Sequence, residues 1–197
     1  MTVGETDYER RDAALAALIQ PLAGEYGLHA DQPMGRTHRA LFATFYEDLL
    51  REPLADALAR DPAPRPSTTL FAAMMADIGG AGAARVLGRP PSATERASYA
   101  LGYNLAIEYL ADVEKTWMLD AFRALDARVL APAGRPLTEW LFLQVHAEGE
   151  AEHAALGHAA CAAVVPASHA ALLQAACADH DADFAVFYGG LADMLEA

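Results

Sequence analysis

The sequence has few cysteines and few basic residues. Its 197 residues include two cysteines, and 14 Lys and Arg stand against 27 Asp and Glu, which gives a net charge of −13. Two cysteines cannot form a disulfide framework and their spacing fits no zinc motif, so we expect Cys161 and Cys177 to be buried thiols. An acidic chain without a Lys/Arg cluster repels phosphate groups, which argues against nucleic acids and anionic membranes as partners.

Targeting and membrane signals are also missing from the sequence. Residues 1–12 are polar and acidic, whereas a signal peptide has a basic start followed by an apolar run. We find no unbroken apolar stretch that is long enough to span a bilayer. We therefore expect a cytoplasmic protein that does not insert into a membrane.

Sustained alternation of apolar and polar residues is absent as well, and β-branched residues are sparse while alanine is abundant. This bias favours helices over strands. Apolar residues make up 54% of the chain and charged residues 21%, a composition typical of a folded globular protein. The length and the lack of repeats and linkers predict a single all-α domain over residues 1–197.

Proline and glycine divide the chain into predicted helices. Residues 1–35 form an N-terminal helix and loop, and a bend is expected at Pro53. Ser92 and Glu95 have the spacing of a capping box that starts a long helix. The predicted helices cover about 6–26, 36–60, 67–78, 94–130, 137–165 and 167–195, with a short helical piece before Gly88. Six or seven helices joined by short loops predict a compact bundle.

The most informative feature is a group of three residues, His146, Glu150 and His153, spaced i, i+4 and i+7. This spacing places all three on one face of a helix, next to small and apolar residues. A buried carboxylate is costly unless it binds a metal or a hydrogen-bond donor. Imidazole with carboxylate is the ligand set of non-haem iron, with manganese as a near alternative and zinc also compatible. The other interpretation is a hydrogen-bonded His–Glu–His stripe without metal.

Three further carboxylates are candidates for facing ligands. Glu114 lies on an apolar stripe of the 94–130 helix, Glu108 lies on the adjacent stripe, and Asp77 ends the third helix. For each of them the alternative is an ordinary surface carboxylate. The remaining histidines have no partners at helical spacing and are interpreted as surface or capping residues; these are His29, His38, His158, His169 and His180.

The stretch 142–153 resembles the His-x-x-x-Asp/Glu-x-x-His helix of the haem-oxygenase-like di-iron oxidases, which belong to a wider group of iron-containing redox enzymes. The stretch 101–112 resembles the family helix that supplies a bridging glutamate, and the order of elements is similar from about residue 36 onwards. The resemblance implies a seven-helix all-α fold with iron held between central helices. It also implies dioxygen activation at Fe(II) and oxidation of a small, amino-acid-like or fatty-acid-like substrate.

Carried over to this sequence, the resemblance assigns His146, Glu150 and His153 as ligands from one helix. Glu108 would be the bridging carboxylate, with Glu114 as its rival, and no catalytic residue is implied beyond the ligands. The family has a glutamate and then a histidine after the third helix. Here Asp77 stands in for the glutamate and nothing matches the histidine, so the second-metal motif is degenerate and one or two Fe(II) ions are expected. This fold often forms dimers, so a homodimer is a further expectation.

Related folds fit less well. A ferritin-like di-metal bundle uses two Glu-x-x-His motifs, and the sequence contains one, at Glu150 and His153. The glycine-rich distal helix of true haem oxygenases is missing, and neither cysteine is placed like the nucleophile of the thiaminase-like relatives. Our hypothesis is a non-haem iron oxidase or oxygenase that uses dioxygen on a small organic substrate. The alternative is a metal-free helical binding or accessory protein on the same fold.

Overall fold

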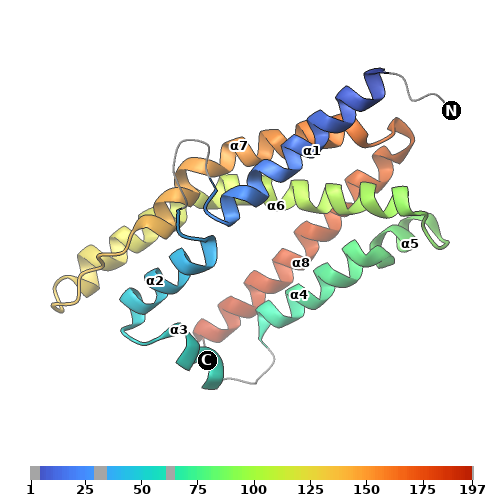
Figure 1. Ribbon diagram of the computed structural model, residues 1–197. Coiled ribbons are helices and arrows are strands. Elements are labelled where there is room, and N and C mark those ends of the chain that lie inside the picture. Colours follow the sequence, from blue (N-terminus) through green and yellow to red (C-terminus); the bar gives the residue numbers. More distant parts are fainter. Residues whose placement is uncertain (1–4, 29–34, 61–64, 197) are drawn as a thin grey trace. The chain divides into compact units, whose positions relative to one another are not determined.

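The computed structural model describes residues 5–28, 35–60 and 65–196, except for the side chains at 5–7, 10, 112–116 and 148–152 (Figure 1). Within these ranges all regular structure is helical and there is no strand, which confirms the all-α prediction. The helices are α1 (Glu5–Glu25), α2 (His38–Leu50), α3 (Leu54–Arg60), α4 (Pro66–Ala76), α5 (Gly82–Leu87), α6 (Ala93–Leu125), α7 (Leu141–Val164) and α8 (Ala170–Glu196).

The described residues thus contain eight α-helices, where six or seven were expected. The break between α2 and α3 accounts for the eighth helix, because α5 is the short helical piece that was expected before Gly88. The predicted bend at Pro53 separates α2 from α3, since the 36–60 segment leaves the helix after Leu50. A π turn, Asp77–Ala81, joins α4 to α5, and Gly80 inside it has φ of 126°, a backbone conformation that favours glycine.

One predicted helix start, that of α6, is confirmed. The backbone N–H of Glu95 donates to Ser92 Oγ at 3.2 Å, and the backbone N–H of Ser92 donates to Glu95 Oε2 at 2.8 Å. This reciprocal pair is the predicted capping box at the start of α6. Thr37 caps α2 in a similar way, because its Oγ1 accepts the N–H of Ala40 at 3.2 Å.

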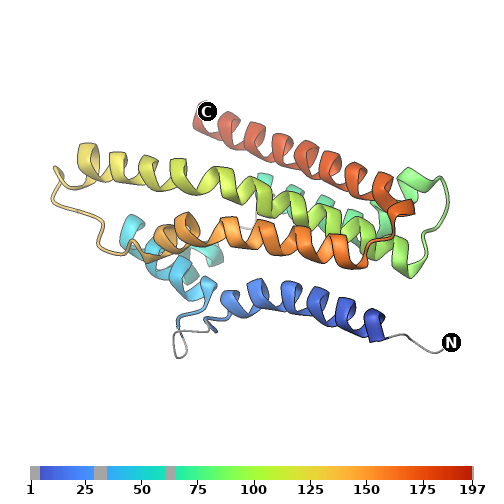
Figure 2. The same ribbon diagram turned by 90° about the horizontal axis from the view of Figure 1, so that it is seen from above.

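The chain divides into two compact units. Unit 1 comprises Met1–Ala14, Ala63–Glu108 and Gly157–Ala197, and unit 2 comprises Leu15–Pro62 and Tyr109–Leu156. Helices α1, α6 and α7 each contribute to both units, and Figure 2 shows α6 as one uninterrupted helix. The expectation of a single domain stays a prediction.

Unit 1 is built around aromatic residues of α6 and small residues of α5 and α8. Its buried core consists of Ala83, Tyr99, Tyr103, Leu172 and Ala176. His180 on α8 is completely buried and its ring packs edge-on against Tyr103. The expectation that His180 is a surface or capping residue was wrong, because the face of α8 that carries Ala176 also carries His180 one turn later.

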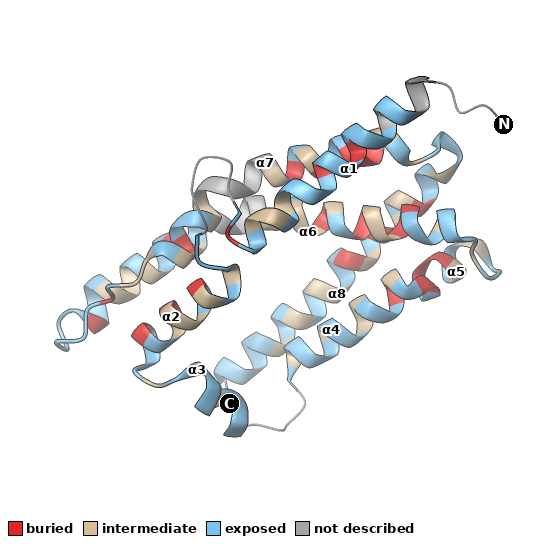
Figure 3. Cartoon of the chain, viewed as in Figure 1, coloured by how far each residue is buried: buried red, intermediate tan, exposed pale blue. Residues whose placement is uncertain are grey.

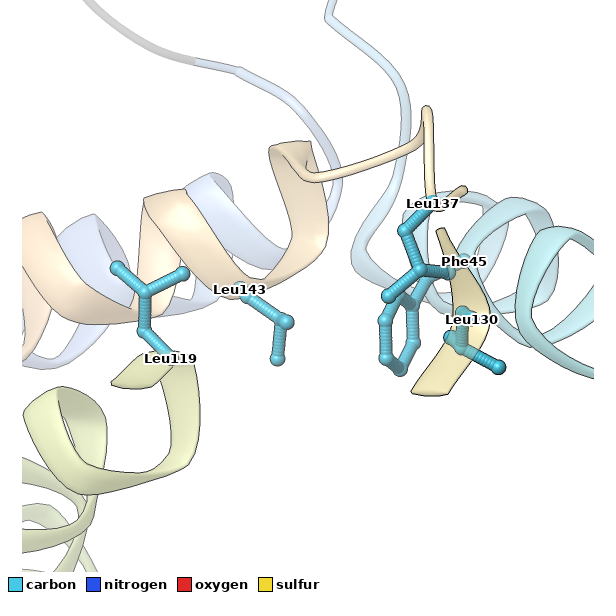
Figure 4. Close-up of a cluster of buried hydrophobic side chains, with 5 residues drawn as sticks. All are labelled: Phe45, Leu119, Leu130, Leu137 and Leu143. Carbon is cyan, nitrogen blue, oxygen red and sulfur yellow. The ribbon is translucent and has the colours of Figure 1, made fainter. Parts of the chain in front are cut away.

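Unit 2 is built around leucines of α6, of α7 and of the segment between these two helices. Figure 4 shows its core residues, which are Phe45, Leu119, Leu130, Leu137 and Leu143. Asp48 on α2 is also buried, and it accepts the backbone N–H groups of Thr138 and Glu139 at 2.6 and 3.0 Å. These bonds fasten α2 to the segment that leads into α7.

One helical run in the described part of the chain, Pro66–Leu87, is long and apolar enough to cross a bilayer by length and composition. The run contains Asp77 and Arg85, so it is not an unbroken apolar stretch, and the expectation stays a prediction. None of the residues of α4 is buried, and Figure 3 shows this helix in the colours of exposed and intermediate residues. The π turn at Gly80 interrupts the run near its C-terminal end.

Candidate metal centre

The predicted ligand helix is α7, and its first turns belong to unit 2. Leu143 anchors this part of the helix in the core of the unit, where it is 1% exposed. His146 follows almost one turn later and is partly buried, as is His153 two turns further along. The ring of His146 lies against the ring of Phe142, with centroids 4.4 Å apart.

The orientation of His146 is set by its own helix. Nδ1 of His146 lies 2.5 Å from the carbonyl oxygen of Phe142, which can only accept a hydrogen bond. Nδ1 therefore carries the proton, and the lone pair of the neutral ring is on Nε2. Metal-bound histidines commonly hold the same arrangement, with one ring nitrogen donating to a carbonyl and the other on the metal. The donor chemistry of His146 thus fits a divalent metal ion.

A second histidine lies beside the first, at the start of α2. The ring centroids of His38 and His146 are 4.4 Å apart, with an angle of 76° between the ring planes. Nδ1 of His38 lies 2.6 Å from Oε2 of Glu25, the last residue of α1. The side chain of His38 is half-buried.

The pKa of Glu25 depends on three nearby imidazoles. The hydrogen bond from His38 lowers the pKa of Glu25 and outweighs the opposing effect of partial burial. The charges that His38, His146 and His153 carry when protonated lower it further. Three imidazoles from α2 and α7 therefore lie within electrostatic range of one carboxylate. Sequence reasoning missed Glu25 and His38, because their contact joins two helices across a loop and leaves no helical spacing to detect.

The predicted carboxylate ligands differ in how far the structure describes them. Glu150 lies on α7 between His146 and His153, but its side chain is outside the described residues, and so is that of Glu114 on α6. Glu108 is half-buried on α6, in unit 1. The metal-binding roles of all three stay predictions. Among the side chains that the structure describes, no three His, Cys, Asp or Glu residues gather closely enough to hold a metal ion.

Asp77 has a different partner. The Arg85 guanidinium donates to both carboxylate oxygens of Asp77, at 2.9 and 2.7 Å. Arg85 also donates to Asp179 at 2.8 Å, and these two carboxylates raise the pKa of Arg85. The Tyr99 hydroxyl donates to Asp179 at 2.5 Å. Asp77 would have to give up its arginine partner in order to bind a second metal, a role that stays a prediction.

The two cysteines are free thiols. Cys161 is buried, as expected, whereas Cys177 is only half-buried. Burial raises the pKa of both thiols, so neither is activated as a thiolate. Each lies near a backbone carbonyl of α6, with Cys177 Sγ 3.4 Å from the oxygen of Gly102.

Comparison of the chain with protein-family models, with curated proteins and with solved structures gave no match.

Proposed function

We propose that α7 holds a ferrous ion through His146, Glu150 and His153, with manganese as the near alternative. On this proposal the protein has a haem-oxygenase-like fold and is a non-haem iron oxidase or oxygenase that uses dioxygen to oxidise a small organic substrate. The observation that carries the proposal is the bond between His146 Nδ1 and the Phe142 carbonyl, which assigns the lone pair to Nε2. Bound iron would supply the activation of dioxygen.

The protein's own contribution is to orient the imidazole and to exclude water around it. Three phenylalanines form a continuous aromatic group beside His146. The ring of Phe142 lies 5.3 Å from that of Phe42 and stacks on that of Phe45 at 5.7 Å. This apolar wall lowers the local polarity and would accept the hydrocarbon part of a small substrate.

A single ion is the form of the site that the contacts favour. Both oxygens of Asp77 are held by Arg85, so the carboxylate predicted for a second ion already has a strong partner. A single ion would need one further carboxylate at most. The expected stoichiometry is therefore one iron per chain.

The test is anaerobic loading with Fe(II), followed by desalting and measurement of retained iron. The native chain should retain about one equivalent, whereas His146→Ala and His153→Ala should retain little. His158→Ala is the matched control, because His158 lies on the same helix with its side chain exposed. The proposal fails if the native chain retains no iron, or if the control loses as much iron as the two site variants.

A metal-free binding or accessory protein is the second candidate. It is favoured because side chains of the site already have hydrogen-bond partners within the protein. Glu25 is paired with His38, and His146 is hydrogen-bonded to the Phe142 carbonyl. Such a network would satisfy the histidines without any ion. The iron measurement separates the two candidates, because only the oxidase requires retention of iron by the native chain and loss of it in the variants.

A further inference from the structure

We propose that His38 is an additional ligand of the same metal ion as His146, and that Glu25 is a positioning residue that orients His38. This inference rests on the proposed function, because it presupposes a metal at His146. It adds two residues from α1 and α2 to a site whose other ligands are on α7. All the residues that carry the argument belong to unit 2.

The separation of the two rings fits ligands that share one ion. A metal–imidazole bond is about 2.0–2.1 Å long, so the ring centroid lies about 3.2 Å from the metal. Two imidazoles at about 90° around one ion then have centroids about 4.5 Å apart. The centroids of His38 and His146 are 4.4 Å apart. The observed centroid separation therefore matches the value expected for two ligands of one ion.

Both rings also have the same hydrogen-bonding pattern, with Nδ1 next to an oxygen atom. Nδ1 of His38 lies 2.6 Å from a carboxylate oxygen of Glu25, and Nδ1 of His146 lies 2.5 Å from the Phe142 carbonyl oxygen. In each ring Nδ1 faces an oxygen that accepts its proton, so in the neutral form of the ring the lone pair lies on Nε2. A carboxylate that accepts from Nδ1 of a metal-bound histidine fixes the orientation of the ring and raises its basicity as a ligand. Glu25 is placed to do this for His38.

The position of His38 is built into the start of α2. Thr37 caps the helix immediately before His38, which fixes the backbone there. Asp48, further along α2, holds the N–H groups of Thr138 and Glu139 ahead of α7. His38 also packs edge-on against the Phe142 ring, with centroids 5.4 Å apart. The first residue of α2 is thus held beside α7 by contacts at both ends of the helix.

The experiment is a Co(II) titration of the intact protein, with binding and ligand geometry followed by the visible d–d absorption of the metal. Retained Fe(II) is measured in parallel on the same variants. Co(II) should bind the native chain at one equivalent. His38→Ala should weaken binding by at least ten- to hundred-fold and change the spectrum, because a nitrogen ligand is lost. His38→Gly should recover the native spectrum when free imidazole is added.

Glu25→Gln tests the positioning role. It should bind one Co(II) with an affinity about ten-fold weaker and a shifted spectrum, since the ligands remain but the orientation of His38 is relaxed. His158→Ala should behave as the native chain. Circular dichroism checks each variant for folding, and His38→Gln, which keeps the bulk of the side chain, replaces His38→Ala if that variant is unfolded.

A failure of this inference can be distinguished from a failure of the proposed function. If His146→Ala abolishes binding while His38→Ala and His38→Gln keep the native affinity and spectrum, the inference is overturned and the proposed function stands. In that case the close ring contact is aromatic packing alone. If the native chain binds neither Co(II) nor Fe(II), the inference and the proposed function both fail.

Discussion

Substitution of Asp48 should lower the stability of unit 2 more than most substitutions, because its buried carboxylate accepts several hydrogen bonds. It accepts the backbone N–H groups of Thr138 and Glu139 and the hydroxyl of Thr138 at 3.2 Å, and it pairs with Arg51 at 2.5 Å. Burial by itself raises the pKa of Asp48, but the two backbone hydrogen bonds and the Arg51 charge outweigh it and lower the pKa below its usual value. The native state therefore favours the ionised carboxylate.

The magnitude follows from these bonds. A hydrogen bond to a charged group contributes about 1.5–3 kcal/mol, but Thr138 and Arg51 are exposed, so water replaces part of what is lost. We therefore expect Asp48→Ala to lower the free energy of unfolding by about 3 kcal/mol, which is well below the sum of the individual bonds. Asp48→Asn keeps one acceptor oxygen and should cost about 1–2 kcal/mol.

Urea unfolding at a series of pH values measures both effects. A carboxylate whose pKa is lower in the folded state contributes stability that is present above its unfolded pKa of about 3.9 and is lost as the pH falls through the folded pKa. The difference between native chain and Asp48→Asn should be constant near neutral pH and shrink below about pH 4. Asp120→Ala is the control, since Asp120 is an exposed α6 residue paired weakly with Arg123 at 3.5 Å. A cost of less than about 0.5 kcal/mol for Asp48→Ala would refute the reasoning, because substitutions at ordinary surface positions have effects of that size.

Two further predictions concern the core of unit 1. Gly82→Ala should lower stability by about 1–3 kcal/mol in thermal or urea unfolding, although alanine favours helix by about 1 kcal/mol, because a Cβ there would overlap the buried Tyr99 ring. An unchanged or higher melting temperature would contradict this. His180→Leu should leave the free energy of unfolding unchanged or raise it by about 1 kcal/mol, since Nε2 of His180 is buried without a hydrogen-bond partner among the described residues. Leucine also loses the contact of Nδ1 with Asp181 at 3.0 Å, but the Asp181 carboxylate is exposed and water replaces that partner. A loss of more than about 2 kcal/mol would show that the imidazole makes a stabilising contact.

The helices themselves were predictable from the sequence because their signals are local. Proline and glycine breaks fall at the predicted places, and the capping box of Ser92 and Glu95 forms as its spacing indicates. The weaker point was the count of helices. The bend at Pro53 was expected, but the sequence does not show whether such a bend divides one helix into two, and the φ of 126° at Gly80 has no unique signature in the sequence.

The partners of charged residues were much harder to predict. Asp77 was a candidate metal ligand, and the structure pairs it with Arg85 across the π turn and brings Asp179 of α8 to the same guanidinium. His180 was expected at the surface, and it is completely buried. In each case the decisive neighbour is on another helix, and no pattern within one helix indicates it.

The sequence by itself determined that the chain is helical and that His146 and His153 share one face of α7, because a helical period follows directly from residue spacing. Only the tertiary structure decided that His38 lies beside His146 and binds Glu25, since 108 positions along the chain separate His38 from His146. Bringing them together requires α2 to be fastened ahead of α7 by Asp48, a contact between residues 90 positions apart. Contacts of this range are selected by the burial and hydrogen bonding of the whole unit, which no local pattern encodes.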